Sequence, residues 1–453
     1  MHPDPNLAVQ PKGEHGSLLI LALLAPVVGA AAGLLGAIFR LALDQADGFR
    51  GALITRAHDA KFGGFLLVTA GCAGAVTIAA WLVRRFSPPA SGSGIPHVEA
   101  VLSGELPPAP PQLIPVKFVG GLLAIGAGLA LGREGPSVQM GATIADFVGN
   151  VSGRRWSDRR VLIAAGAGAG LATAFNAPIA GAVFVLEELV RRFDTRIAIT
   201  ALGASAGAIA VARILLGSAP DFQVEPLGYA RLQVWPLFVA LGAVAGLAAT
   251  LYNSTLLGAV RIAERLGRWS VELQAAVIGG ALGILAWFAP GLVGGGDQIT
   301  QRVLAGEAAV ALVPLAFLLR FGLGAVSYAA STPGGLFAPM LVLGAQLGVF
   351  FGALYRAVFP GLGVDPVAFA IVGMAAFFTG VVQAPVTGIV LVTEMTAGFA
   401  LLLPMLGACF AAMLVVNLFG SAPIYDSLKE RAVRHHQPED FTRTEGARSG
   451  NSR

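Results

Sequence analysis

The sequence predicts a polytopic membrane protein with short and broken helices, built from two related halves. Three observations support this fold class: the composition, the lengths of the uncharged runs, and two blocks of sequence that recur in the same order. Of the 453 residues, 55% are hydrophobic and 12% are charged, whereas about 25% of the residues in a typical soluble domain are charged. The composition, which includes 60 glycines, excludes an ordinary soluble protein.

The formal net charge of +4 does not indicate a nucleic-acid-binding protein. The basic residues lie in short runs between apolar segments, and no aromatic residues alternate with them to stack on bases. The two cysteines, Cys72 and Cys409, each lie inside an apolar run and form neither a disulfide framework nor a metal motif. The sequence also lacks the common hydrolase, metalloprotease and nucleotide-binding motifs. We therefore expect no enzymatic activity, no cofactor and no bound metal.

The uncharged runs predict the membrane helices. The first run, residues 17–39, is too long for a secretory signal and is expected to be the first membrane helix. Other runs are long enough to span the membrane: 62–83, 161–186, 232–260, 273–296, 321–355, 366–393 and 395–425. Four runs fall below the minimum of about 17 residues: 118–132, 135–145, 197–212 and 308–319.

Short and broken helices at membrane depth are stable only where they are buried in protein or line a wet cavity. They therefore favour a transport path. A helical bundle with re-entrant packing elements and no transported substrate is the alternative.

An internal repeat indicates that the chain consists of two related halves. The segment APIAGAVFVLEEL from Ala177 recurs as APVTGIVLVTEMT from Ala384, an offset of 207 residues. Upstream, GREGPSVQMG from Gly132 aligns with GLFAPMLVLG from Gly335, an offset of 203 residues. Two blocks in the same order with nearly equal offsets predict duplicated halves at about 17–217 and 232–425, an architecture typical of transporters.

Little of the chain lies outside the predicted membrane domain, residues 17–425. A polar segment, 1–16, precedes it, and a polar tail, 426–453, follows it. The tail is rich in basic residues, so the positive-inside tendency places it in the cytoplasm.

Three segments place glycines before a proline in the first turn of a helix: GSGIP at 92–96, GREGP at 132–136 and GGLFAP at 334–339. Glycine lets backbone amides approach a ligand closely, and a helix N-terminus attracts anions. Together the segments predict a desolvated anion site without a lysine, although glycine and proline also simply end helices. The glycines expected at these helix N-termini are Gly92, Gly94, Gly132, Gly135 and Gly335.

Two hydroxyl groups could take part in such a site. Ser93 lies between the glycines of the first segment and could donate to an anion or cap the following helix. Tyr425 ends the last long apolar run and could donate inward, or it could belong to an aromatic belt.

Glu134 is the most informative single residue. A carboxylate in an apolar membrane segment is costly and usually functional. At an anion site it would compete with the anion when ionised and leave the site when protonated. Its counterpart in the second repeat is Phe337, so the halves differ here. The alternative is a surface ion pair with Arg133.

Glu187 and Glu188 follow an uncharged run, and adjacent residues on a helix point about 100° apart. One is a candidate proton-binding carboxylate and the other is expected to be paired or solvated; an acidic cap at the end of a span is the alternative. Lys117 and Arg320 are expected to be paired structural charges. The GAGAG at 166–170 is better explained by close helix packing than by phosphate binding.

In this order and spacing, GSGIP, GREGP and GGLFAP resemble the signature regions of the CLC family of chloride channels and transporters. The resemblance covers the region from the first span to Tyr425 and includes the NAPIAG segment before Glu187. It implies an all-α fold with two inverted repeats, and a homodimer with one pore in each subunit. By the same resemblance, Ser93 and Tyr425 would bind chloride through their hydroxyls, with the backbone at Ile95 and Phe337 lining the path.

The resemblance also implies that Glu134 is the external gate and Glu188 the internal proton-transfer residue, which favours a proton-coupled chloride antiporter. A passive voltage- or pH-gated chloride channel of the same fold is the first alternative, and a non-transporting membrane scaffold is a remote one. The expected partners are chloride, protons, membrane lipids and a second copy of the chain, with no nucleic acid. We expect a multi-pass protein of the inner (plasma) membrane, with His97 in a solvated loop.

Overall fold

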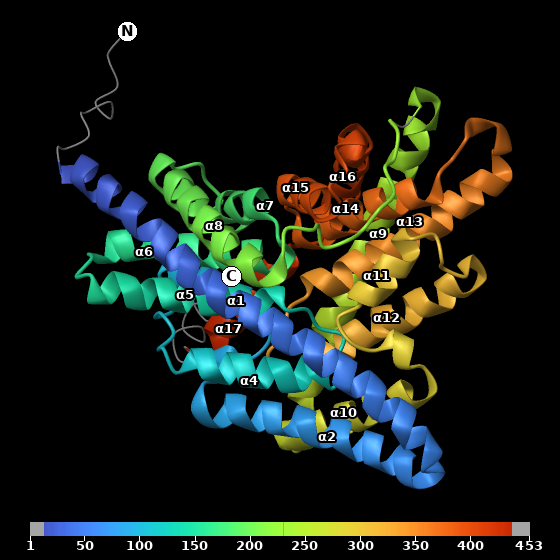
Figure 1. Cartoon of the computed structure of the whole chain (residues 1–453), viewed down its shortest axis with the longest axis horizontal. Helices are drawn as coiled ribbons and strands as arrows, with labels where there is room; N and C mark the ends of the chain where they lie inside the picture. Colours follow the sequence, from blue (N-terminus) through green and yellow to red (C-terminus); the bar gives the residue numbers. More distant parts are fainter. Residues whose placement is uncertain (1–12, 230, 437–453) are drawn as a thin grey trace, which may run out of the picture.

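The computed structural model describes residues 13–229 and 231–436, which form helices joined by turns and loops. The first half of the chain contains α1 (Gly13–Asp59), α2 (Lys61–Phe86), α3 (Ile95–Ser103), α4 (Leu113–Gly126), α5 (Glu134–Val151), α6 (Trp156–Phe175), α7 (Pro178–Phe184) and α8 (Thr195–Leu216). A single π-helical turn, η2 (Val185–Leu189), follows α7. The long helix α1 crosses the front of the molecule in Figure 1.

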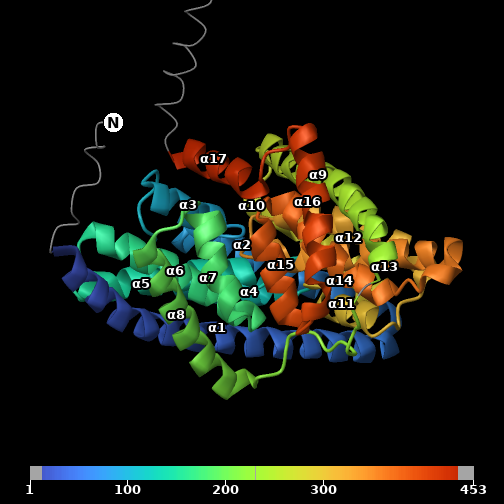
Figure 2. The same ribbon diagram turned by 90° about the horizontal axis from the view of Figure 1, so that it is seen from above.

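The second half contains α9 (Trp235–Arg265), α10 (Val271–Phe288), α11 (Asp297–Leu304), α12 (Val313–Tyr328), α13 (Phe337–Val358), α14 (Pro366–Val382), α15 (Pro385–Thr396) and α16 (Leu402–Leu418). The final helix, α17 (Ile424–His436), lies on the opposite side of the molecule from α1 (Figure 2). It packs against α3.

Helix packing in the second half repeats that of the first. In the first half α6 packs against α1, α5 and α8, and in the second α14 packs against α9, α13 and α16. Glycines allow the close approach of α5 to α6 and of α13 to α14. A Cβ on Gly141 would lie 2.3 Å from the carbonyl oxygen of Gly166, and one on Gly344 would lie 2.4 Å from that of Gly373. The prediction that the GAGAG segment serves helix packing is confirmed.

Two sets of reciprocal contacts relate the two repeats by a twofold axis. Gly132 and Gly335, which are equivalent in the two repeats, exchange backbone hydrogen bonds of 2.8 and 2.7 Å in an antiparallel bridge. Glu187 accepts bonds from the first amides of α15, and its equivalent Glu394 accepts bonds from the first amides of α7. Equivalent residues that bond each other reciprocally lie about a twofold axis.

Eight of the described helices are long and apolar enough to cross a membrane, which makes the chain an integral multi-pass membrane protein. Two runs expected to be too short are parts of such helices. The run 197–212 lies within α8, whose apolar span is 22 residues long. The run 308–319 continues past Arg320 to Tyr328, because the Arg320 guanidinium is bonded to backbone carbonyls and does not end the helix.

Two helices extend beyond the limits expected from the sequence. Helix α1 does not stop at Phe39 but continues to Asp59, since its charged residues form ion pairs: Arg40 with Asp221, and Arg50 with Asp47. At the other end, the boundary expected after Tyr425 falls inside α17, where Leu428 and Val433 are buried. The expected tail therefore begins as a packed helix, and residues 1–12 and 437–453 of the two tails lie outside the described residues.

Candidate functional site

The three glycine-proline segments meet in the middle of the fold. Gly92 donates to the carbonyl of Thr332 at 3.1 Å, and Gly334 donates back to the carbonyl of Gly92 at 3.1 Å. The bridge between Gly132 and Gly335 joins the second segment to the third. Helices α3, α5 and α13 begin at these loops, so the structure brings together the three N-termini that the sequence singled out.

Close backbone approach explains several of the glycines. Gly94, with φ +87°, precedes α3 in a left-handed conformation, and Gly92 has φ +61°. A Cβ on Gly135 would lie 2.4 Å from the carbonyl oxygen of Ser93. A Cβ on Gly132 or on Gly335 would lie 2.0 Å from a carboxylate oxygen of Glu134. Side chains are therefore excluded around both Ser93 and Glu134.

Glu134 is fully buried at the start of α5. Its Oε1 accepts a hydrogen bond of 2.6 Å from the amide of Phe337, the first residue of α13, while Oε2 has no partner among the described residues. The alternative of a surface pair with Arg133 is wrong. Arg133 pairs instead with Asp297 at 2.9 Å and Asp221 at 3.1 Å. A carboxylate thus occupies the anion-attracting end of α13.

The two candidate hydroxyls are both unpartnered. Ser93 and Tyr425 have no exposed surface, and neither Oγ nor the phenolic oxygen has a hydrogen-bond partner in the described chain. The Tyr425 ring lies 5.9 Å from the ring of Phe337, so Tyr425 is not a residue of an aromatic belt. The amide of Ser93 donates at 3.4 Å to the hydroxyl of Tyr328, a neighbour that the sequence did not indicate. Ile95 is buried at the first position of α3.

Two buried cations hold the loops of the site in place. Lys117 of α4 donates to the carbonyls of Ala90 and Gly92 at 3.0 and 2.8 Å. Arg320 of α12, 203 residues later, donates to the carbonyls of residues 292, 294 and 295 before α11. Both were expected to be paired charges. Within the described chain they are bonded to backbone carbonyls rather than to carboxylates, so they fix loop geometry.

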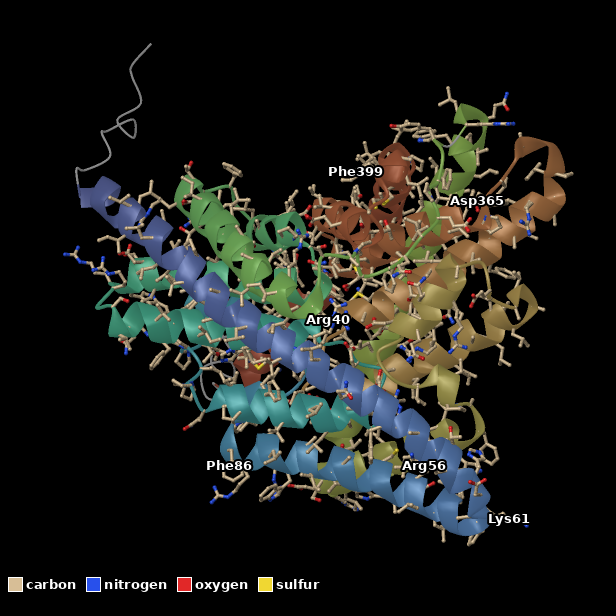
Figure 3. The ribbon with its side chains drawn as sticks, viewed as in Figure 1. Arg40, Arg56, Lys61, Phe86, Asp365 and Phe399 are labelled. Carbon is tan, nitrogen blue, oxygen red and sulfur yellow. The ribbon has the colours of Figure 1, made fainter. Side chains whose placement is uncertain are left out.

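Two cavities approach this arrangement from opposite ends of α10. One, of about 650 Å³, is lined by Gly92, Gly94, the start of α10 and α17. The other, of about 350 Å³, is lined by Gly132, Arg133, Asp297 and the segment after α10. Near the second, Arg40 lies midway along α1 (Figure 3) and shares Asp221 with Arg133. The glycine-proline segments lie between the cavities.

The structure separates the roles of the adjacent glutamates. Glu187 accepts hydrogen bonds of 3.0 and 2.6 Å from the amides of Val386 and Thr387 at the start of α15. Glu188 is 3% exposed and lines a cavity of about 430 Å³ together with Glu99. Glu187 thus caps α15, whereas Glu188 forms an ion pair with Arg191 and faces a cavity beside α3.

Several residues of this region were missed or misplaced by the sequence reasoning. Glu99 is buried in α3, where a carboxylate two residues after His97 interrupts an apolar segment. Asp426 directly follows Tyr425 but was assigned to the tail. His97 was expected in a solvated loop; it lies in α3 and is 9% exposed, because α3 is covered by neighbouring helices and α17.

Comparison with known families agrees with this geometry. The family model described as voltage gated chloride channel matches residues 74–417. The chain belongs to the CLC family.

Curated relatives of this CLC protein include two named H(+)/Cl(−) exchange transporter ClcA. The protein from Salmonella paratyphi B is 35% identical over 439 residues, with 95% of this chain and 93% of the relative covered. The protein from Klebsiella pneumoniae is 36% identical over 436 residues, with 95% and 92% covered.

Solved structures of the family have the same fold. A slow cyanobacterial Cl−/H+ antiporter superposes with a TM-score of 0.87 at 32% identity, covering 94% of this CLC protein and 99% of that chain. A CLC-type fluoride/proton antiporter, at 23% identity, shares the fold with a TM-score of 0.75 and coverage of 90% and 97%.

Proposed function

We propose that this CLC protein exchanges chloride for protons across the membrane. The observation that carries the proposal is the buried Glu134 carboxylate, bonded to the Phe337 amide between two cavities. A negative group already occupies a helix N-terminus there, so a mobile anion and the ionised carboxylate compete for one place. Relatives at 35% and 36% identity named H(+)/Cl(−) exchange transporters support the choice of ions.

The chloride would bind where the unpartnered donors are. Ser93 and Tyr425 supply two buried hydroxyls that have no partner among the described residues, and the N-termini of α3 and α13 supply the backbone at Ile95 and Phe337. Hydroxyls and helix N-termini hold an anion without a full positive charge. A lysine or arginine in their place would bind the anion too tightly to release it quickly.

The same competition couples the two ions. Ionised Glu134 accepts the Phe337 amide hydrogen and blocks the anion path. Protonation removes the charge that favours this position, the side chain leaves, and chloride takes the amide. Return of Glu134 then requires loss of both its proton and the chloride. We assign Glu188, which faces a separate cavity, as the residue that passes protons between Glu134 and the inner solution.

Basic residues line the cavities on the side of α17. Arg84 lines the larger one, and Arg160, Arg191, Arg192 and Lys429 line the one at Glu188. By the positive-inside tendency this side faces the cytoplasm, which supports a cytoplasmic C-terminus in the plasma membrane.

We also propose a homodimer in which a second copy covers α7, α8, α15 and α16. These helices lie along one edge of the molecule (Figure 1) and carry exposed apolar side chains, among them Leu202 and Leu406. The carboxylates of Glu187 and Glu394 are only partly buried at this edge. Carboxylates at membrane depth are unfavourable against lipid, so a protein surface fits this edge better than lipid does.

The test of the function uses purified protein in liposomes. A chloride gradient is imposed, the voltage is held with valinomycin and potassium, and the external pH is followed. Antiport predicts that protons move against their own gradient. Chloride flux without proton movement would indicate a passive channel, and absence of chloride flux would indicate a non-transporting protein.

Glu134→Ala is expected to abolish uphill proton movement while chloride flux continues. The variant removes the only side chain in the site that both blocks the anion path and carries a proton. The same liposome assay measures both fluxes. Continued proton pumping by this variant would contradict the assignment of Glu134 as the gate.

Glu188→Gln is expected to stop proton movement and leave chloride flux, because the amide cannot take up a proton. Glu187→Gln is the matched control on the adjacent residue, whose carboxylate is bonded to α15. It should keep proton transport, although an amide caps α15 less well. Loss of proton movement in the Glu187 variant alone would reverse the assignment.

Tyr425→Ala is expected to weaken chloride binding by about 10- to 100-fold, since a hydrogen bond to a charged group contributes about 1.5–3 kcal/mol. Isothermal titration calorimetry with chloride measures this affinity. Tyr355→Ala, a tyrosine near the far end of α13, is the control and should bind chloride normally. Unchanged affinity in the Tyr425 variant would remove the tyrosine from the site.

The dimer predicts a particle of twice the chain mass of 46.2 kDa, after subtraction of detergent, in light scattering. Leu202→Trp combined with Leu406→Trp should shift the protein to a monomer by placing bulk on the proposed interface. Leu66→Trp on α2, where Leu66 is similarly exposed, should leave the dimer intact. A monomeric wild-type protein would refute the proposal.

A further inference from the structure

The guanidinium of Arg191 is shared between two carboxylates. Its Nη2 lies 3.4 Å from Oε1 of Glu188, and its Nη1 lies 2.7 Å from Oδ2 of Asp426, the residue after Tyr425. The shorter contact is to Asp426. Arg191 therefore links Glu188 of η2 to the first turn of α17.

The backbone holds Arg191 in this position. Its φ is +55°, in the left-handed region that a residue with a side chain rarely adopts. The chain turns sharply there after the π-helical turn η2, and Nε of Arg191 donates back to the carbonyl of Glu188 at 3.2 Å. A strained residue of this kind persists where the surrounding structure fixes it, often at functional sites.

The other charged groups near Glu188 come from each element around it. Glu187 is its neighbour in η2, and Glu99 projects from α3 with one carboxylate oxygen that has no partner in the described chain. The same cavity is also lined by Arg160 of α6, Arg192 after η2, Asp194 and Arg196 at the start of α8, and Lys429 of α17. Arg196 pairs with Asp158 at 2.7 Å. Arg160 donates to the carbonyl of Leu102, and Lys429 pairs with Glu105. Among the described residues, Arg191 is the cation that forms an ion pair with the Glu188 carboxylate.

We propose that Arg191 and Asp426 are positioning residues that together set the proton affinity of Glu188. Arg191 favours the charged carboxylate, and Asp426 limits this effect by holding the guanidinium at the longer distance from Glu188. The inference rests on the proposed proton-transfer role of Glu188 and deepens it.

The two substitutions that break this link predict opposite results. Asp426→Asn removes a negative neighbour and releases Arg191 to pair fully with Glu188, so protonation of Glu188 becomes harder. Arg191→Gln removes the positive neighbour, so protonation becomes easier. A purely structural link would respond in the same way to both changes, because both break the same ion pair.

The experiment measures uphill proton movement in liposomes as a function of internal and external pH. The pH of half-maximal proton movement should fall by about 0.5–1 unit in Asp426→Asn and rise by a similar amount in Arg191→Gln. Opposite charges near a carboxylate shift its titration by 1–3 units, and the partial exposure of Arg191 reduces the effect. Unchanged profiles, or shifts in the same direction, would overturn the proposal.

Glu105→Gln is the matched control. It breaks another ion pair of α17, the 3.0 Å contact between Lys429 and Glu105, which does not involve Glu188. The hydrogen bond from Ser103 and then the charge of Lys429 lower the pKa of Glu105, so the pair is charged at neutral pH. Glu105→Gln should keep the wild-type pH profile. Asp426→Glu, which retains the negative charge that Asp426→Asn removes, should also keep it.

A second measurement does not need transport activity. The infrared band of the protonated Glu188 carboxyl, identified by its loss in Glu188→Gln, is titrated in each purified variant. It should shift in the same directions as the transport profile, and an unshifted band would overturn the proposal. Failure of the wild-type protein to move protons uphill would contradict the proposed function instead.

Discussion

The proposed function of this CLC protein depends on one buried interaction, the hydrogen bond from the Phe337 amide to the Glu134 carboxylate. An unpaired charge is costly inside a protein, so the carboxylate requires a donor wherever it rests. The backbone provides that donor because α13 begins there and because Gly132 and Gly335 leave room on both sides. Lys117 and Arg320 bond the backbone carbonyls of neighbouring loops. Under the proposed function, the Glu134 side chain is the group that moves.

The contacts that hold the scaffold together occur in both repeats, whereas the proposed site depends on a position at which the two repeats differ. The bridge between Gly132 and Gly335, the caps by Glu187 and Glu394, and the buried cations all obey the repeat. Glu134 does not, since its equivalent is Phe337, whose amide it binds. The two repeats thus form a symmetric scaffold, and the Glu134 carboxylate, which has no counterpart in the second repeat, lies where the two repeats meet.

The sequence was sufficient for the features that depend on local chemistry. Glycine-proline loops, the offset of the repeats and an isolated carboxylate in an apolar segment singled out Ser93 and Glu134, which lie where the loops meet. Features that depend on contacts with distant parts of the chain could not be predicted from the sequence. The helix through Arg320 continues because carbonyls from another segment bond the guanidinium. The different surroundings of Glu187 and Glu188 lie in a π-helical turn that no periodicity in the sequence indicates.

Helix α3 separates two cavities on the side of α17, and this separation bears on how the two ions are kept apart. Gly94, Pro96 and His97 line the cavity that reaches the first glycine-proline segment. Glu99 and Ser103, farther along the same short helix, line the cavity at Glu188. Under the proposed function, chloride and protons therefore approach from the inside on different sides of α3 and share a path only at Glu134. Coupling then requires one residue to serve both routes, and Glu134 is the carboxylate at the point where the three glycine-proline segments converge.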